Sequence, residues 1–214
     1  MDNSSIEILP SPHENDFDEL VRKIGRVKNY VNYIHLDMAD GSMSDHVSYH
    51  EPELFTGIAR EINLEAHFVM NKPMKVLERF AKAGFKRLIA HLEASDPRDF
   101  TRETKALGVE VGIAIDGPSE LDTIEPYLEE VDGVLVMMYK AGPSGQMPSP
   151  ANIEKVRSIR EAYPLLPITV DGGMNEQLAK IVIQAGATRL VATSFLFKQN
   201  PDNLEDAIER LRTS

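Results

Sequence analysis

The chain has 214 residues, and its 23 Lys and Arg residues against 34 Asp and Glu residues give it a formal net charge of -11. Hydrophobic residues make up 42% and charged residues 27%, as in globular proteins that bury a substantial core. The negative charge, with no Lys or Arg run longer than two, argues against a nucleic-acid partner. The absence of cysteine excludes disulfides, thiolate metal sites and a cysteine nucleophile.

The first 14 residues lack the basic and then apolar pattern of a signal peptide. No apolar run approaches the roughly 18 residues of a membrane span. We therefore expect a cytoplasmic protein with no membrane partner.

Eight short runs rich in β-forming residues follow one another along the chain. These predicted strands are residues 6–9, 33–36, 64–69, 87–91, 110–115, 133–138, 167–170 and 189–192. Apolar residues recur at helical spacing between several of them, for example at Phe17, Leu20, Val21 and Ile24. The alternation of strands and helices indicates an α/β fold with a parallel sheet.

The predicted helices carry recognisable end signals. Gly84, Gly108 and Gly186 stand where a helix needs a left-handed residue before the next strand. Three polar residues are predicted N-caps, namely Ser119, Ser149 and Asn175. Prolines at or near other helix starts are Pro73, Pro97 and Pro201.

Eight strand-helix units in this length average about 27 residues each, which is short but adequate for a closed (β/α)8 barrel, or TIM barrel. An open doubly wound sheet is the alternative, and it would usually contain fewer strands. No linker or change of composition divides the chain, so we expect residues 1–214 to form one (β/α)8 barrel domain. In a barrel, functional residues gather where the strands end.

Four polar residues near predicted strand ends suggest a metal site. His35 and Asp37 are two residues apart, so the alternation of a strand places them on one face. His67 on the third strand and Asp171 at the end of the seventh would complete a set of two histidines and two carboxylates. Such a set suits divalent Zn, Fe, Mn or Co. His91 and Glu93 on the fourth strand have the same spacing, and periodicity alone does not choose between the two pairs.

Glycine-rich loops after the last three strands suggest an anion site. In such barrels phosphate commonly binds to backbone N–H groups of the loops after strands seven and eight. The residues concerned are Gly142, Ser144, Gly145, Gln146, Gly172, Gly173, Thr193 and Ser194. For any single glycine pair an ordinary turn is the alternative reading.

In their order along nearly the whole chain, the motifs resemble the ribulose-phosphate 3-epimerase family. They are Pro10-Ser11, His35-Leu36-Asp37 with Asp40-Gly41, His67 followed by Asn71-Lys72-Pro73, His91-Leu92-Glu93-Ala94, Val136-Met137, Gly142 with Gly145-Gln146, and Val170-Asp171-Gly172-Gly173. Seven motifs in the same order are far more specific than any one of them.

The resemblance implies a (β/α)8 barrel that holds one divalent metal ion, most often zinc or iron. It implies His35, Asp37, His67 and Asp171 as ligands, and it excludes His91 and Glu93 from the ligand set. Asp37 and Asp171 would also be the two catalytic acid/base groups. Ser11, His67 and Met137 would line the substrate site together with the glycine-rich loops.

The implied reaction is the interconversion of D-ribulose 5-phosphate and D-xylulose 5-phosphate, a step of the pentose phosphate pathway. Epimerisation beside a ketone needs two proton carriers on opposite faces of a planar enediolate, which suits carboxylates from distant strands. The small-molecule partner would be a ketose phosphate, and the family suggests a homo-oligomer.

Several positions depart from the family pattern. Residues 42–46 replace a usual His-Phe-Val-Pro-Asn segment, Ala39 and Val69 stand where methionines are general, and Thr193 replaces a glycine beside the phosphate. These changes leave open an epimerase of another ketose phosphate, such as allulose 6-phosphate, or a phosphosugar-binding barrel without catalysis. A decarboxylase or aldolase would normally need a strand lysine, and Lys140 reads better as a solvated loop residue.

Overall fold

Eight parallel strands form the centre of the molecule. The computed structural model describes residues 6–139 and 149–214. The strands are β1 (Glu7–Pro10), β2 (Tyr33–Ala39), β3 (Asn63–Val69), β4 (Arg87–His91), β5 (Glu110–Ile115), β6 (Gly133–Met137), β7 (Ile168–Asp171) and β8 (Arg189–Ala192). Each of the eight predicted strands is present, with ends shifted by up to three residues.

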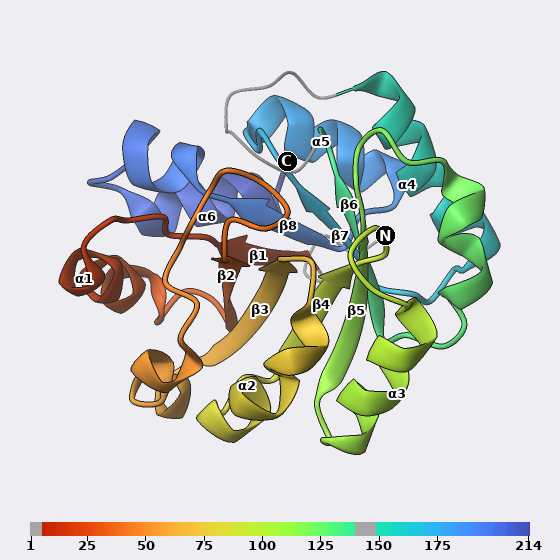
Figure 1. Ribbon diagram of the computed structural model, residues 1–214. Coiled ribbons are helices and arrows are strands. Elements are labelled where there is room, and N and C mark those ends of the chain that lie inside the picture. Colours follow the sequence, from red (N-terminus) through yellow and green to blue (C-terminus); the bar gives the residue numbers. More distant parts are fainter. Residues whose placement is uncertain (1–5, 140–148) are drawn as a thin grey trace.

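The strand order identifies a barrel. Neighbours in the sheet follow the order β1-β8-β7-β6-β5-β4-β3-β2, so consecutive strands lie side by side and the last pairs with the first. β1 also packs beside β2, which nearly closes the ring. Figure 1 shows the helices arranged around the outside of these strands. The (β/α)8 prediction is confirmed, and the doubly wound alternative is wrong because no strand order reverses.

The helices on the outside are of unequal length. The α-helices are α1 (Phe17–Val27), α2 (Leu77–Ala83), α3 (Pro97–Ala106), α4 (Pro150–Ala162), α5 (Glu176–Ala185) and α6 (Leu204–Arg212). In the connections β2–β3 and β5–β6, short 3-10 turns take the place of an α-helix: η2 (Pro52–Phe55), η3 (Ile58–Arg60), η5 (Leu121–Thr123) and η6 (Glu125–Tyr127). A 3-10 turn, η4 (Pro73–Lys75), precedes α2, and a π-helical turn, η7 (Phe195–Gln199), follows β8. These turns explain how so short a chain completes a barrel.

Most of the predicted helix ends agree with the structure. Gly84 and Gly186 end α2 and α5 at φ values of +100° and +113°, where a residue with a Cβ would be strained. The Asn175 side chain accepts a hydrogen bond from the Leu178 N–H, as an N-cap does. The prediction for Ser119 is wrong: this residue lies in the loop after β5, and its hydroxyl donates to Glu93 instead.

The core has an outer and an inner part. Alternate strand residues such as Ile34, Leu36 and Met38 belong to the large apolar cluster that also contains the buried helix faces. The other residues point into the barrel, where the small apolar cluster consists of Ile89, Ala114, Leu135 and Met137. Much of the remaining interior is polar, and it includes the fully buried His35, Glu65, His67 and His91. A polar interior costs stability unless its groups are paired, which directs attention to these side chains.

Candidate metal and acid/base site

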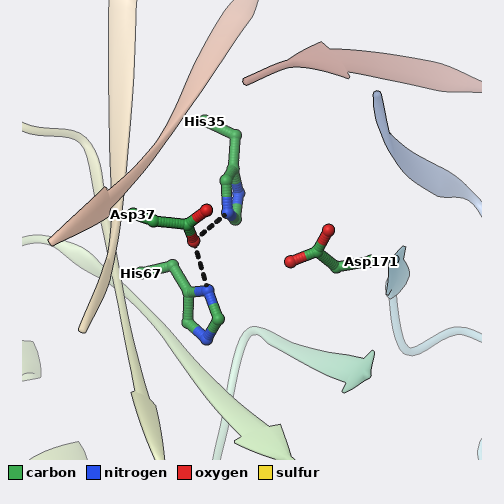
Figure 2. Close-up of side chains that lie close together, drawn as sticks. All are labelled: His35, Asp37, His67 and Asp171. Carbon is green, nitrogen blue, oxygen red and sulfur yellow. Dashed lines mark hydrogen bonds and ion pairs between the residues drawn. The ribbon is translucent and has the colours of Figure 1, made fainter. Parts of the chain in front are cut away.

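The four predicted ligands meet at the end of the barrel where the strands finish. One potential ligand atom from each of His35, Asp37, His67 and Asp171 lies within 4.8 Å of the others. Figure 2 shows the two histidines and Asp37 on one side of a shared space, with the Asp171 carboxylate pointing at it from the other side. The strands therefore bring together residues that are 136 positions apart in the sequence (171 - 35).

Strand pairing explains how the cluster forms. In the register of β2 with β3, Asp37 is opposite His67 and His35 is opposite Glu65. Residues two apart on a strand share a face, so His35 and Asp37 both point inward. Asp37 Oδ1 lies 3.1 Å from His35 Nε2 and 2.8 Å from His67 Nδ1. A single carboxylate oxygen thus faces two imidazole nitrogens (Figure 2).

Each histidine has a second partner on its other ring nitrogen. His35 Nδ1 lies 2.6 Å from Glu65 Oε1, and the other Glu65 oxygen pairs with Arg87. His67 Nε2 lies 2.9 Å from His91 Nε2, and His91 Nδ1 lies 3.3 Å from Glu93 Oε2. The pair His91 and Glu93, which spacing alone left as possible ligands, therefore lies behind His67. Among the described residues it lies outside the four-residue group that could hold a metal.

The two carboxylates experience opposite electrostatic environments. Burial alone would raise the pKa of Asp37, but the charge of His35 and hydrogen bonds from His13, His35 and His67 hold that pKa well below its usual range. Burial, together with the negative charge of Asp37, raises the pKa of Asp171. The pKa of His35 is well above its usual value: burial opposes this, but Asp37 and Glu65 outweigh it. The group thus combines one strongly acidic carboxyl with one that holds its proton more readily.

The donor set fits a divalent cation. Two carboxylates and two imidazole nitrogens converge within 4.8 Å of one another. Mixed nitrogen and oxygen ligands of this kind suit Zn, Fe, Mn or Co. The outer nitrogens of both histidines are occupied, which is the arrangement that keeps the inner nitrogens oriented toward a metal.

His13 contacts Asp37, and the sequence analysis did not identify it. His13 Nε2 lies 2.8 Å from Asp37 Oδ2 and 3.0 Å from the Ser11 hydroxyl oxygen. Its ring stacks on His46, with centroids 6.0 Å apart and planes at 14°. Ser11 was predicted to line the site, and it is fully buried beside the end of β1. The only signal for His13 in the sequence was its position two residues after Ser11.

The structure describes only some of the residues predicted to bind an anion. Gly172 and Gly173 have positive φ values of +119° and +67°. A Cβ at Gly172 would come within 2.8 Å of the Tyr139 ring, so that ring packs directly on the loop. Thr193 and Ser194 lead into η7. Four predicted substrate residues, Gly142, Ser144, Gly145 and Gln146, lie outside the described residues, as does Lys140.

Met137 and Tyr139 flank the cluster on the side of β6. Met137 is buried and lies opposite Asp171 in the register of β6 with β7. Burial, followed by the nearby charge of Asp171, raises the pKa of Tyr139 to about 12. The Tyr139 hydroxyl is thus a neutral group at the rim of the site.

Comparison with known proteins gives a family that agrees with this geometry. The model of the ribulose-phosphate 3 epimerase family matches residues 7–197. The chain belongs to this family. A ribulose-phosphate 3-epimerase from Chlamydia muridarum is 32% identical over 186 residues, covering 83% of this chain and 81% of the relative. One from Bacillus subtilis is 29% identical over 218 residues, covering 98% and 99%.

Family membership makes the chain an isomerase of the epimerase type that acts on carbohydrates. The resemblance found in the sequence is thereby confirmed, and a decarboxylase or aldolase is not supported.

Solved structures share the fold at low identity. A 3-keto-L-gulonate-6-phosphate decarboxylase from Vibrio cholerae has a TM-score of 0.77 at 12% identity and covers 98% of this chain and 96% of its own. A 3-hexulose-6-phosphate synthase from Salmonella typhimurium has a TM-score of 0.73 at 14% identity, covering 97% of each chain. At such identity the likeness supports the barrel alone. Within residues 6–139 and 149–214, no helix has the length and apolar character needed to cross a membrane.

Proposed function

We propose that this chain is a divalent-metal-dependent epimerase that interconverts D-ribulose 5-phosphate and D-xylulose 5-phosphate at C3. The observation that carries the proposal is the placement of Asp37 and Asp171 on opposite sides of one buried cluster, with pKa values displaced in opposite directions. The family and its relatives support the same reaction class.

Two proton carriers on opposite faces are what C3 epimerisation requires. One carboxylate removes the C3 proton to give a planar enediolate, and the other carboxyl returns a proton to the opposite face. Groups whose environments separate their pKa values are suited to hold opposite protonation states at the same pH. Because Asp37 and Asp171 interact, their pKa values belong to the pair and not to either residue alone. The two carboxyl groups exchange the roles of proton donor and proton acceptor when the reaction runs in the opposite direction.

His35, Asp37, His67 and Asp171 would hold one divalent ion, with zinc the first candidate and iron, manganese or cobalt the alternatives. When bound, the ion stabilises negative charge that develops on the substrate oxygens. Ser11, His67 and Met137 would line the reacting end of the sugar. Backbone N–H groups of Gly172, Gly173, Thr193 and Ser194 would bind its phosphate, since glycines with positive φ let the backbone approach an anion closely.

The test is solvent deuterium exchange at C3 of D-ribulose 5-phosphate, followed by proton NMR on protein whose metal content has been measured. We expect Asp37→Asn and Asp171→Asn each to slow exchange by about 10³-fold or more, because each removes a proton carrier. Asp202→Asn, at an exposed position before α6, is the matched control and should exchange normally. The proposal fails if wild-type protein exchanges no pentulose or hexulose phosphate.

Allulose 6-phosphate should be tested in the same assay, because the loop that differs from the family pattern reaches the site. His46, within the segment 42–46 that differs from the family pattern, stacks on His13, which contacts Asp37. Faster exchange on allulose 6-phosphate would identify an epimerase of a longer ketose phosphate. Thermal stabilisation by both sugars without exchange would instead identify a binding protein.

A further inference from the structure

The fully buried His91 lies between a predicted metal ligand and a carboxylate on the adjoining loop. Its Nε2 is 2.9 Å from His67 Nε2, and its Nδ1 is 3.3 Å from Glu93 Oε2. The His67 and His91 rings are stacked, with centroids 4.8 Å apart and planes at 29°. The proposed reaction gives neither His91 nor Glu93 a role, although burying them has a cost.

Proton positions along this chain of contacts follow from metal binding. His67 Nδ1 faces Asp37, so Nδ1 is the nitrogen available to a metal, and a neutral imidazole must then carry its proton on Nε2. That proton points at His91 Nε2, which must accept it. His91 therefore carries its own proton on Nδ1, where it donates to Glu93 Oε2.

Glu93 is fixed by donors on its other oxygen. The Asp116 backbone N–H donates to Glu93 Oε1 over 3.0 Å, and the Ser119 hydroxyl donates to the same atom. Burial would raise the pKa of Glu93, but hydrogen bonds from His91, Ser119 and the backbone lower it to about 2. The ionised carboxylate thus accepts hydrogen bonds on both oxygens. It can accept a hydrogen bond from His91 Nδ1, but it cannot donate one.

We propose that His91 and Glu93 are positioning residues that hold His67 in the one tautomer able to bind a metal through Nδ1. This inference rests on the proposed function for its metal, but its test needs no substrate. His35 is held differently, because Glu65 accepts directly from its Nδ1. The site thus has one histidine fixed by an adjacent carboxylate and one fixed through an intervening imidazole.

The isosteric Glu93→Gln variant should move the proton of His91 and the proton of His67 each to the other ring nitrogen. The amide oxygen of the new side chain would remain at the Asp116 N–H and Ser119 hydroxyl, because turning the amide over would place its NH2 against the backbone N–H. The NH2 would then face His91 Nδ1, moving the His91 proton to Nε2. His67 Nε2 would have to accept that proton, leaving the His67 proton on Nδ1, where the metal should bind.

The measurement is zinc affinity by competition with a chromophoric chelator, together with the histidine tautomers from long-range proton-nitrogen NMR correlations. We expect Glu93→Gln to weaken zinc binding by roughly 10- to 100-fold, which is the usual effect of losing such a support. The His91 proton should move from Nδ1 to Nε2. Glu53→Gln, the same substitution at an exposed glutamate paired with Arg79, is the matched control and should change neither.

His91→Leu removes the intermediate ring and should weaken zinc binding by a similar factor. His91→Gln can still accept from His67 and donate to Glu93, so it should recover most of the affinity. If His91→Leu fails to fold, the isosteric Glu93→Gln carries the test. Wild-type zinc affinity in Glu93→Gln, or weaker binding with the His91 tautomer unchanged, overturns the inference. Absence of sugar exchange in wild-type protein would refute the proposed function and leave this result standing.

Discussion

The two ends of the barrel interior both contain buried charge, but their carboxylates face different partners. At the lower end, where the strands begin, Arg87 contacts Glu65 and Glu110, and Arg189 contacts Glu7 at 3.2 Å. At the upper end, where the strands finish, Asp37 and Asp171 share a cluster with the imidazoles of His35 and His67. Carboxylates paired with arginines are typical of a structural network, whereas carboxylates grouped with imidazoles are typical of a site that receives a cation or moves protons.

Glu65 connects the two ends. One of its oxygens binds His35 of the upper cluster, and the other pairs with Arg87 of the lower network. Burial would raise the pKa of Glu65, yet His35 and Arg87 lower it to about 2. His35 first, and Arg87 of the lower network after it, thus keep this carboxylate ionised. The difference between the ends therefore lies in the groups that face the carboxylates, and substitutions at the two ends should change stability in opposite directions.

The largest effect on stability is expected at the lower end. Arg87→Met would leave the fully buried Glu65 without its arginine partner, at a cost of about 3–5 kcal/mol in the free energy of unfolding. Urea unfolding measures this cost. Arg79→Met breaks an exposed pair with Glu53 and should change stability little. Equal effects of the two substitutions would show that the lower network is not a buried, compensated one.

A smaller effect of opposite sign is expected at the upper end. Asp171→Asn should stabilise the metal-free protein by about 0.5–2 kcal/mol at neutral pH, because it removes a buried charge that burial and Asp37 disfavour. Since folding raises the pKa of Asp171, its contribution to stability is full at low pH and is lost as pH rises through that pKa. Unfolding curves from pH 4 upward should therefore converge at low pH. A destabilised variant at neutral pH would contradict the expectation that the charge of Asp171 is unfavourable in the folded, metal-free protein.

The smallest effect is expected at His13, on the rim of the upper end. The hydrogen bond from His13 helps to hold the pKa of Asp37 low, so His13→Leu should raise that pKa. The acid limb of the pH profile of kcat/KM should then move to higher pH, because the carboxylate must be ionised to remove a proton. His50→Leu, at a histidine that contacts the Ser48 carbonyl, is the control. An unchanged acid limb would mean that His13 does not influence the reacting carboxylate.

Local patterns predicted the fold well because a barrel repeats one local unit. Runs of β-branched residues identified the strands, and Gly84 and Gly186 identified helix ends that only a residue without a Cβ adopts easily. The end of β2 was placed three residues too early. Its last residues pair with β3 as far as Ala39 opposite Val69, and pairing of that kind is not visible in one segment.

The sequence by itself determined the strand and helix order and the residue types able to bind a metal, because both depend on spacing within one element. Motif order also indicated the family. Only the tertiary structure decided which polar residues touch: His13 on Asp37, Glu65 between His35 and Arg87, and Glu93 behind His91. These contacts join different strands and loops, and strand register together with barrel closure sets their distances. Spacing alone could not rank His91 and Glu93 against His35 and Asp37, because both pairs follow the same two-residue alternation.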